Sequence, residues 1–454
     1  MLALRLTRGS HPAVQLRRLL VAVASAGTGF LLLCTLGYAL GHPDSPAAAA
    51  LRLAWCATPL AATVYFAVAV ARTDPATKPR PGLSAIGLGP GRLMAISATT
   101  TALACTLGSM LALLFFLHLR GDLTGMPFDG AAAEFLASDT PLPLPAALTL
   151  LAIVPATASV SVALTLRPKD TSPKSAPRSY GRFGAYGRSG TRETFGTYGR
   201  FGAHLRTGGR KAEVEETPTP APEPAADAEP TATVTVTVTG PVDLDPTRPP
   251  APREVPKGLP WGVAVLAAGL AVEAYANRTA DTDGLSMPGG HAGGPAGVLA
   301  GWVLTALGLA LAGPGLTHLC GRLLQAVRPG ALRLLAGRVL MEEATRIGRP
   351  LGVVCAVASG AYAMTALYDT DAAVGPLTTL GTLLVTGCTV ATLLTAAVEA
   401  RQARADTTAA LVRLGAPATV LRSAAALRAG ALLALFVPLT VVIAELAALP
   451  LAHR

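Results

Sequence analysis

The feature that most constrains this sequence is a series of nine long apolar stretches. Each holds about 20 residues, the length that an α-helix needs to cross a bilayer, and a helix pairs its own backbone polar groups in lipid. The stretches cover residues 19–40, 51–71, 93–117, 144–166, 259–276, 297–319, 351–368, 376–398 and 423–449. We therefore predict an all-α polytopic membrane protein with about nine transmembrane helices, in a range of about 8 to 10.

Composition agrees with this class, because 51% of the residues are hydrophobic and only 14% are charged. The six cysteines lie in or beside the apolar stretches without a C-x-x-C pair, which indicates small core residues and not disulfides or metal ligands. Arg5, Arg8, Arg17 and Arg18 precede the first stretch as they would in a signal peptide. That stretch continues without a small-x-small cleavage site, so we interpret it as a retained first helix.

Lys and Arg gather in alternate connecting segments, which indicates that these segments lie on the cytoplasmic side. The basic segments are the N-terminus, 72–92, 167–258, 320–349 and 399–422. Nine spans then place the N-terminus in the cytoplasm and the C-terminus outside it. This topology accounts for the net charge of +10 without a nucleic-acid partner. Abundant Ala, Gly, Arg and Pro suggest a bacterial plasma membrane.

Residues 168–257 differ from the rest of the chain. A Tyr/Gly/Arg-rich tract with two copies of YGRFGA is followed by the acidic, Pro-rich run EVEETPTPAPEPAADAEP. Such a composition cannot bury enough apolar surface to offset the cost of ordering, so we predict a disordered cytoplasmic linker. Arg beside aromatic residues is also typical of single-strand nucleic-acid binding. We favour contact between the arginines and anionic lipid headgroups.

The chain on either side of this linker contains an internal repeat. The matching segments are 3–6 with 331–334, 22–27 with 356–361, and 88–93 with 414–422. We therefore divide the chain into a first repeat with about four spans (1–167), the linker (168–257), two extra spans (258–320) and a second repeat with about three spans (321–454). Duplicated bundles of this kind are a common transporter plan.

A short basic helix is predicted between the last two spans, in the run EARQARADTTAALVRLGA at 399–416. Leu411 and Leu414 share one side of it, while Arg404 and Arg413 are exposed. Gly415 favours a helix end and Pro417 prevents continuation, so the next span restarts at a defined angle. The alternative is that Gly-x-Pro is only the tight turn that any such loop needs.

This run resembles the loop of FtsX-like (MacB/FtsX-type) ABC-transporter permeases, in which a basic segment leads into a helix that ends in Leu-Gly-Ala. In that family the helix docks on the ATP-binding cassette subunit. The resemblance implies a coupling segment at 399–422 and a first-repeat counterpart at 82–92. The coupling residues that it implies are Arg401, Arg404, Asp406, Arg413, Leu414, Gly415 and Pro417, with Gly89, Pro90 and Arg92 in the first repeat.

The sequence departs from the family pattern in three respects. The first-repeat counterpart, GLSAIGLGPGR, is Gly-rich and has no basic run. The second repeat has no fourth span. The loops that follow the first span of each repeat are too short for a large extracytoplasmic domain.

The sequence contains no catalytic motif that we recognise. P-loop, H-E-x-x-H and G-x-S-x-G signatures with suitable partners are missing, so we expect no enzyme and no cofactor or metal bound by this chain. ATP and Mg²⁺ are expected on the partner subunit. Glu273, Glu445 and Arg428 lie inside predicted spans and are candidate functional residues, although anchoring at the membrane interface is the interpretation we favour.

We thus expect the permease subunit of an ABC transporter, which couples ATP binding and hydrolysis in a separate cassette protein to helix movement for export or mechanotransmission. One alternative is a non-transporting scaffold or signalling protein with a degenerate permease fold. An ion-coupled secondary transporter is less favoured, because no carboxylate lies at mid-depth in a span. The sequence leaves the substrate and a homodimer open.

Overall fold

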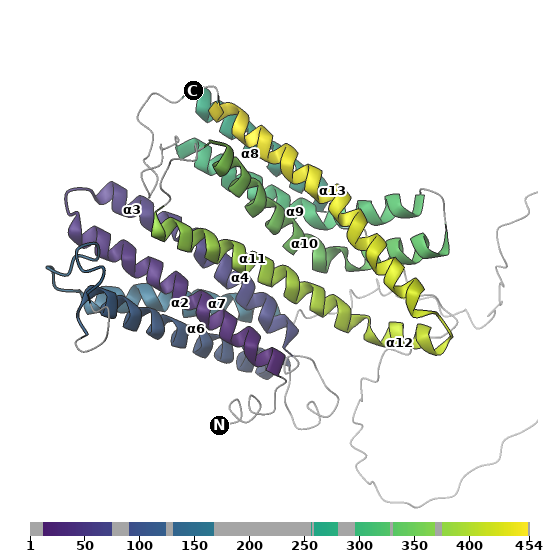
Figure 1. Cartoon of the computed structure of the whole chain (residues 1–454), viewed down its shortest axis with the longest axis horizontal. Coiled ribbons are helices and arrows are strands. Elements are labelled where there is room, and N and C mark those ends of the chain that lie inside the picture. The colour runs from purple at the N-terminus through teal and green to yellow at the C-terminus, as the bar shows by residue number, and fades with distance from the viewer. Residues whose placement is uncertain are drawn as a thin grey trace, which may run out of the picture. The chain divides into compact units, whose positions relative to one another are not determined.

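The computed structural model is all-helical in the residues that it describes, with no strand among them (Figure 1). The described residues are 12–74, 90–123, 130–167, 256, 258–279, 296–326, 330–367 and 375–452. Contacts group Met1–Lys169 with Arg253–Arg454 in one unit and Asp170–Pro252 in another. The predicted disordered linker lies outside the described residues, apart from residue 256.

Eight of the described helical segments are long and apolar enough to cross a membrane, which confirms the predicted polytopic helical class. Several begin with proline in their first turn, where its fixed φ favours the helix and its missing N–H is not needed. The helices are α2 (Pro12–Gly41), α3 (Pro46–Trp55), α4 (Ala57–Thr73), α6 (Pro90–Arg120), α7 (Leu144–Leu166), α8 (Gly258–Thr279), α9 (Ala296–Ala326), α10 (Ala331–Leu367), α11 (Pro376–Ala403), α12 (Ala405–Arg413) and α13 (Ala418–Ala452).

The predicted span at 351–368 falls in the second part of α10, which is not among the eight. The first part of α10 carries charged residues, and this polar half lowers the mean hydropathy of the helix. Close backbone contacts show that α10 runs antiparallel to α9: a Cβ added at Gly313 would lie 2.1 Å from the carbonyl oxygen of Gly348, and one at Gly352 would lie 2.3 Å from that of Leu309. Helix α10 therefore packs along a candidate span, α9.

The segment predicted as the first repeat forms a bundle in which α7 packs against α2, α4 and α6. The buried side chains of α7, among them Leu151, Val154 and Val162, are at most 1% exposed. In the segment predicted as the second repeat, α10 packs against α11 and α13. Helix α11 lies beside α4, where the hydroxyl of Thr63 is 3.9 Å from Cys388 Sγ, and it also packs against α2. Helix α11 therefore connects the segments predicted as the two repeats.

Helices α8 and α9 form a tightly packed antiparallel hairpin that lies against α10. Small residues allow the two backbones to approach, as is common between membrane helices. The glycines of this interface, at each of which an added Cβ would lie within 3.0 Å of the facing helix, are Gly262, Gly269, Gly297, Gly301, Gly308 and Gly315. These two helices occupy the segment for which two extra spans are predicted.

Candidate partner-coupling site

The break between α12 and α13 is a helix-terminating motif with defined hydrogen bonds. Gly415 has a φ of +88°, the left-handed conformation that glycine adopts without strain. Its N–H donates to Val412 O, and the N–H of Ala416 donates to Leu411 O, both at 3.0 Å. This pair of bonds is the Schellman motif. The predicted helix stop at Gly415 is confirmed, and α13 begins at Ala418, directly after Pro417.

Helix α12 is short, amphipathic and uncovered by the described residues. It contains no buried residue, and Leu414 at its end is 84% exposed. Asp406 lies in its first turn and Arg413 in its last turn, which suits the helix dipole at both ends. An apolar tip beside a charged rim is the surface expected of a helix that docks on a soluble partner.

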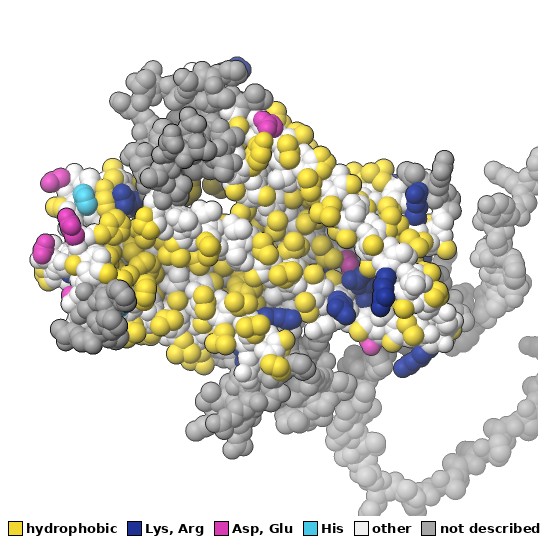
Figure 2. Space-filling model, in the orientation of Figure 1, with side chains coloured by type: hydrophobic (Ala, Val, Ile, Leu, Met, Phe, Trp, Pro, Cys, Tyr) yellow, Lys and Arg dark blue, Asp and Glu magenta, His cyan; other side chains and the backbone are white. Residues whose placement is uncertain are grey.

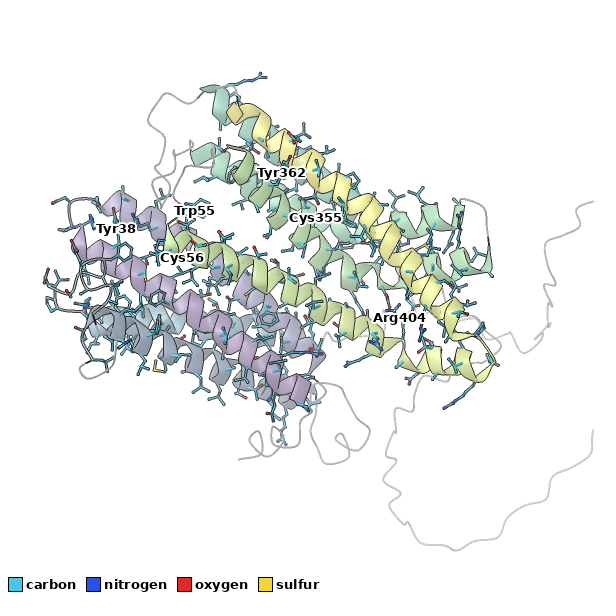
Figure 3. The ribbon with its side chains drawn as sticks, viewed as in Figure 1. Tyr38, Trp55, Cys56, Cys355, Tyr362 and Arg404 are labelled. Carbon is cyan, nitrogen blue, oxygen red and sulfur yellow. The ribbon has the colours of Figure 1, made fainter. Side chains whose placement is uncertain are left out.

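Arg404 lies between α11 and α12 and connects this junction to α10 (Figure 3). Its Nε is 2.7 Å from Glu343 Oε1 on α10 and donates to Ala400 O at 3.1 Å. The hydroxyls of Thr407 and Thr408 each donate to the Arg404 carbonyl oxygen at 2.9 Å. The direction in which the chain leaves α11 is therefore fixed by one side chain and its own backbone.

Glu343 is nearly buried, with 5% of the residue exposed. Burial raises its pKa from the usual 4.5 to about 7, while the positive charges of Arg404 and Arg346 act in the opposite direction and Glu342 raises it further. The carboxyl of Glu343 thus changes charge near neutral pH. This residue precedes the predicted span in α10 and was not among the predicted site residues.

A second ion pair lies at the end of α4, and its residues were not among the predicted site residues. Asp74 directly follows α4, as Arg404 directly follows α11. Asp74 pairs with Arg18 on α2, and Nη1 of the neighbouring Arg17 donates to the Thr73 hydroxyl at 3.3 Å. The residue after α4 is thus paired with α2 and the residue after α11 with α10, with the signs of the charges exchanged.

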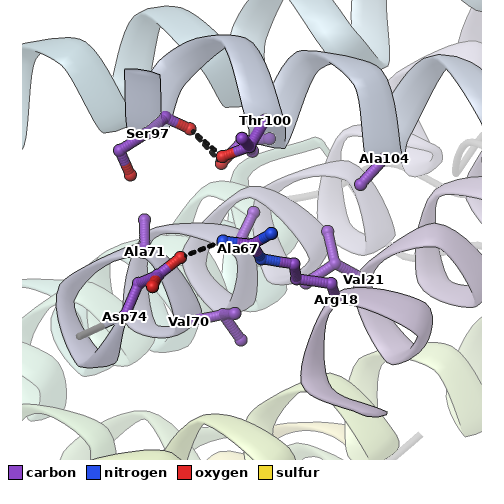
Figure 4. Close-up of a pocket in the computed structure, with 10 residues that line it drawn as sticks. Arg18, Val21, Ala67, Val70, Ala71, Asp74, Ser97, Thr100 and Ala104 are labelled. Atoms are coloured by element: carbon purple, nitrogen blue, oxygen red, sulfur yellow. Dashed lines mark hydrogen bonds and ion pairs between the residues drawn. The ribbon is translucent and has the colours of Figure 1, made fainter. Parts of the chain in front are cut away.

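A small pocket adjoins the Arg18–Asp74 pair between α2, α4 and α6 (Figure 4). Ser97 and Thr100 of α6 face the ion pair across it, and Val21 and Ala67 line its apolar side. The hydroxyl of Thr100 donates to Ser97 O at 2.9 Å, within its own helix. This arrangement gives the end of the first bundle a polar recess beside a charged contact.

The remaining predicted coupling residues fall in different places. Arg401 is exposed at the end of α11. Arg92 is exposed near the start of α6, which begins at Pro90, whereas Gly89 and the counterpart segment before it lie outside the described residues. Figure 2 shows Lys and Arg side chains near α12 and most Asp and Glu side chains at the far end of the bundle, on the face in view.

The three candidate residues inside spans lie in different surroundings. Glu445 is exposed on α13 and accepts a hydrogen bond of 3.0 Å from the hydroxyl of Tyr362. Arg428 is half-buried on the same helix. Glu273 is only 1% exposed on α8, and its assignment as an interfacial anchor stays a prediction. Helix α9 packs against this part of α8.

Comparison of the chain with protein families, with curated proteins and with solved structures finds no match. The class of the protein rests on its fold and its site. It is a polytopic helical membrane protein in which an exposed amphipathic helix lies between two spans.

Proposed function

We propose that this protein is the membrane-spanning permease subunit of an ABC transporter with an FtsX-like arrangement, and that α12 is its coupling helix. The observation that carries the proposal is α12 itself, which lies exposed between two spans, ends in a Schellman motif and is held to α10 through Arg404. Such a helix can receive a push from a soluble partner and pass it to both spans.

The partner in this proposal is an ATP-binding cassette protein that supplies ATP, Mg²⁺ and hydrolysis, because the chain has no P-loop of its own. Leu414 is the apolar contact, and Arg401 and Arg413 form the charged rim around it. Nucleotide-driven movement of α12 then shifts α11 and α13, and α10 follows through the contact between Glu343 and Arg404. The N-terminus and α12 lie on the cytoplasmic side in this scheme, as the distribution of Lys and Arg supports.

Co-purification from native membranes tests this function. The double variant Leu414→Asp with Arg413→Glu is expected to lose at least about 90% of the bound ATP-binding cassette protein. The first substitution replaces the central apolar contact with a charge, and the second reverses a charge of the rim. Leu334→Asp is the matched control, because Leu334 is an exposed leucine outside the predicted spans, on α10. Recovery of no cassette protein with the wild type, or equal recovery with the double variant, contradicts the proposal.

A further inference from the structure

Glu273 is a carboxyl group enclosed in the apolar α8–α9 hairpin. Nε1 of Trp302 donates to its Oε1 at 2.6 Å. Its Oε2 is buried and has no hydrogen-bond partner among the described residues. A polar atom buried in this way carries a large free-energy penalty, and ionisable residues within spans commonly mark proton or ion pathways.

A second unpaired polar atom lies one helical turn away in the same interface. Thr305 is 6% exposed and its buried hydroxyl has no hydrogen-bond partner among the described residues. The hydroxyl faces Gly269, since a Cβ added there would lie 2.5 Å from it, and Glu273 follows Gly269 by one turn. Because helical side chains lean toward the N-terminus of their helix, the carboxyl of Glu273 points toward the layer that contains this hydroxyl.

Among the described residues, no positively charged side chain donates a hydrogen bond to Glu273 Oε2. The other ionisable residues on α8 and on the two helices packed against it are Tyr275 and Arg278 on α8, His318, Cys320 and Arg322 on α9, and Arg422, Arg428 and Glu445 on α13. His318 and Arg322 lie about four or more turns beyond Trp302, and Glu445 accepts its hydrogen bond from Tyr362. The described residues also hold no group of three metal-ligating side chains.

We propose that Glu273 is a proton-binding site within the α8–α9 hairpin, with the hydroxyl oxygen of Thr305 as the acceptor for the bound proton. A proton from hydronium adds to Oε2 and forms an O–H bond, which leaves water and a neutral carboxylic acid. Oε2, an unpaired acceptor before protonation, then carries an O–H group that can donate a hydrogen bond to the Thr305 hydroxyl oxygen. Trp302 continues to donate to Oε1 in both states. This site stands independently of the cassette partner.

Trp302 can report the charge of Glu273, because the two side chains share a hydrogen bond. The chain has three tryptophans, so a parent with Trp55→Phe and Trp261→Phe leaves Trp302 as the only one. The emission of this full-length parent in lipid nanodiscs is measured from about pH 5 to about pH 9, a range in which buried carboxyl groups titrate. We expect one sigmoidal change, lost in Glu273→Gln and retained in Glu445→Gln.

Two further variants test the acceptor. Thr305→Val is expected to move the midpoint of the emission change, whereas Thr317→Val is not, because the Thr317 hydroxyl already donates to Gly313 O at 2.8 Å. A parent whose emission does not change with pH overturns the proposal whether or not the Gln variant folds. A transition that survives in Glu273→Gln, or that Glu445→Gln removes instead, overturns it as well.

Discussion

Arg404 connects three helices through its guanidinium and its carbonyl group. Its partner Glu343 is the ionisable residue at this junction whose pKa is shifted. The pKa of Glu343 is raised from 4.5 to about 7, chiefly by burial and against the effect of Arg404. A carboxyl group with a raised pKa in the folded state favours folding at low pH, where it is protonated. That contribution declines as the pH rises through about 7.

We therefore expect the melting temperature of the wild type to fall by about 2 °C or more between about pH 5 and about pH 8 beyond any fall in Glu343→Gln, in which this group cannot titrate. Differential scanning fluorimetry of the purified protein in detergent or nanodiscs measures the difference. Glu342→Gln is the control, because Glu342 is the exposed neighbour. Parallel pH profiles for the wild type and Glu343→Gln would show that Glu343 is not the responsible group.

Residues at this scale were only partly predictable. Arg404, Arg413 and Gly415 stand within one continuous motif, so the sequence alone could point to them. Glu343 lies 61 positions from its partner Arg404, and Arg18 lies 56 positions from Asp74, so only the packing of the helices reveals these two ion pairs.

Helix α12 owes its defined end to Gly415, and this dependence can be tested. Any L-residue at a φ of +88° is strained, so Gly415→Val is expected to cost about 1–2 kcal/mol locally and to loosen the last turn of α12. Hydrogen exchange followed by mass spectrometry should detect faster exchange in residues 405–416. Gly430→Ala is the matched control, because Gly430 has no neighbour within 4 Å and sits inside α13. Unchanged exchange in Gly415→Val would mean that α12 does not need this stop.

The contact between α9 and α10 makes a second prediction about elements. A Cβ at Gly313 would meet the Gly348 carbonyl oxygen at 2.1 Å, so Gly313→Ala must push the two backbones apart. We expect a loss of about 1–3 kcal/mol, seen as a lower melting temperature or lower detergent resistance. Gly360→Ala on α10, where nothing lies within 4 Å, should leave stability within about 0.5 kcal/mol. Similar effects for the two variants would contradict this packing.

Apolar length predicted most of the helices, because crossing a membrane imposes one length on every span. It could not show that α10 is one helix whose polar first part continues into the predicted span, since helix ends outside the membrane carry no hydropathy signal. The burial of Glu273 was also missed. Its position near the end of α8 indicates access to water, and only the packing of α9 over it removes that access.

At the scale of the whole molecule, each of the two segments predicted as repeats contains an ion pair between the end of one span and an earlier helix. If each ion pair stabilises the protein through charge, reversing the charge of one residue should destabilise the fold. Reversing both charges should restore part of that stability. The single variant Asp74→Arg is expected to lower the stability of the protein. The double variant Arg18→Asp with Asp74→Arg is expected to recover about 1 kcal/mol of that loss. Thermal unfolding of the four proteins of this cycle measures the coupling. A coupling near zero would leave the pair without an energetic role.

The central claim is that α12 docks on an ATP-binding cassette protein, and site-specific photocrosslinking in native membranes tests it most directly. A photoreactive residue at position 414 is compared with one at position 307 on α9, where an exposed leucine lies within a candidate span. We predict that position 414 captures a cassette protein, identified by its P-loop peptide and with a yield that changes on ATP addition, and that position 307 does not. Capture of lipid alone at 414, or the same protein at both positions, would contradict the account.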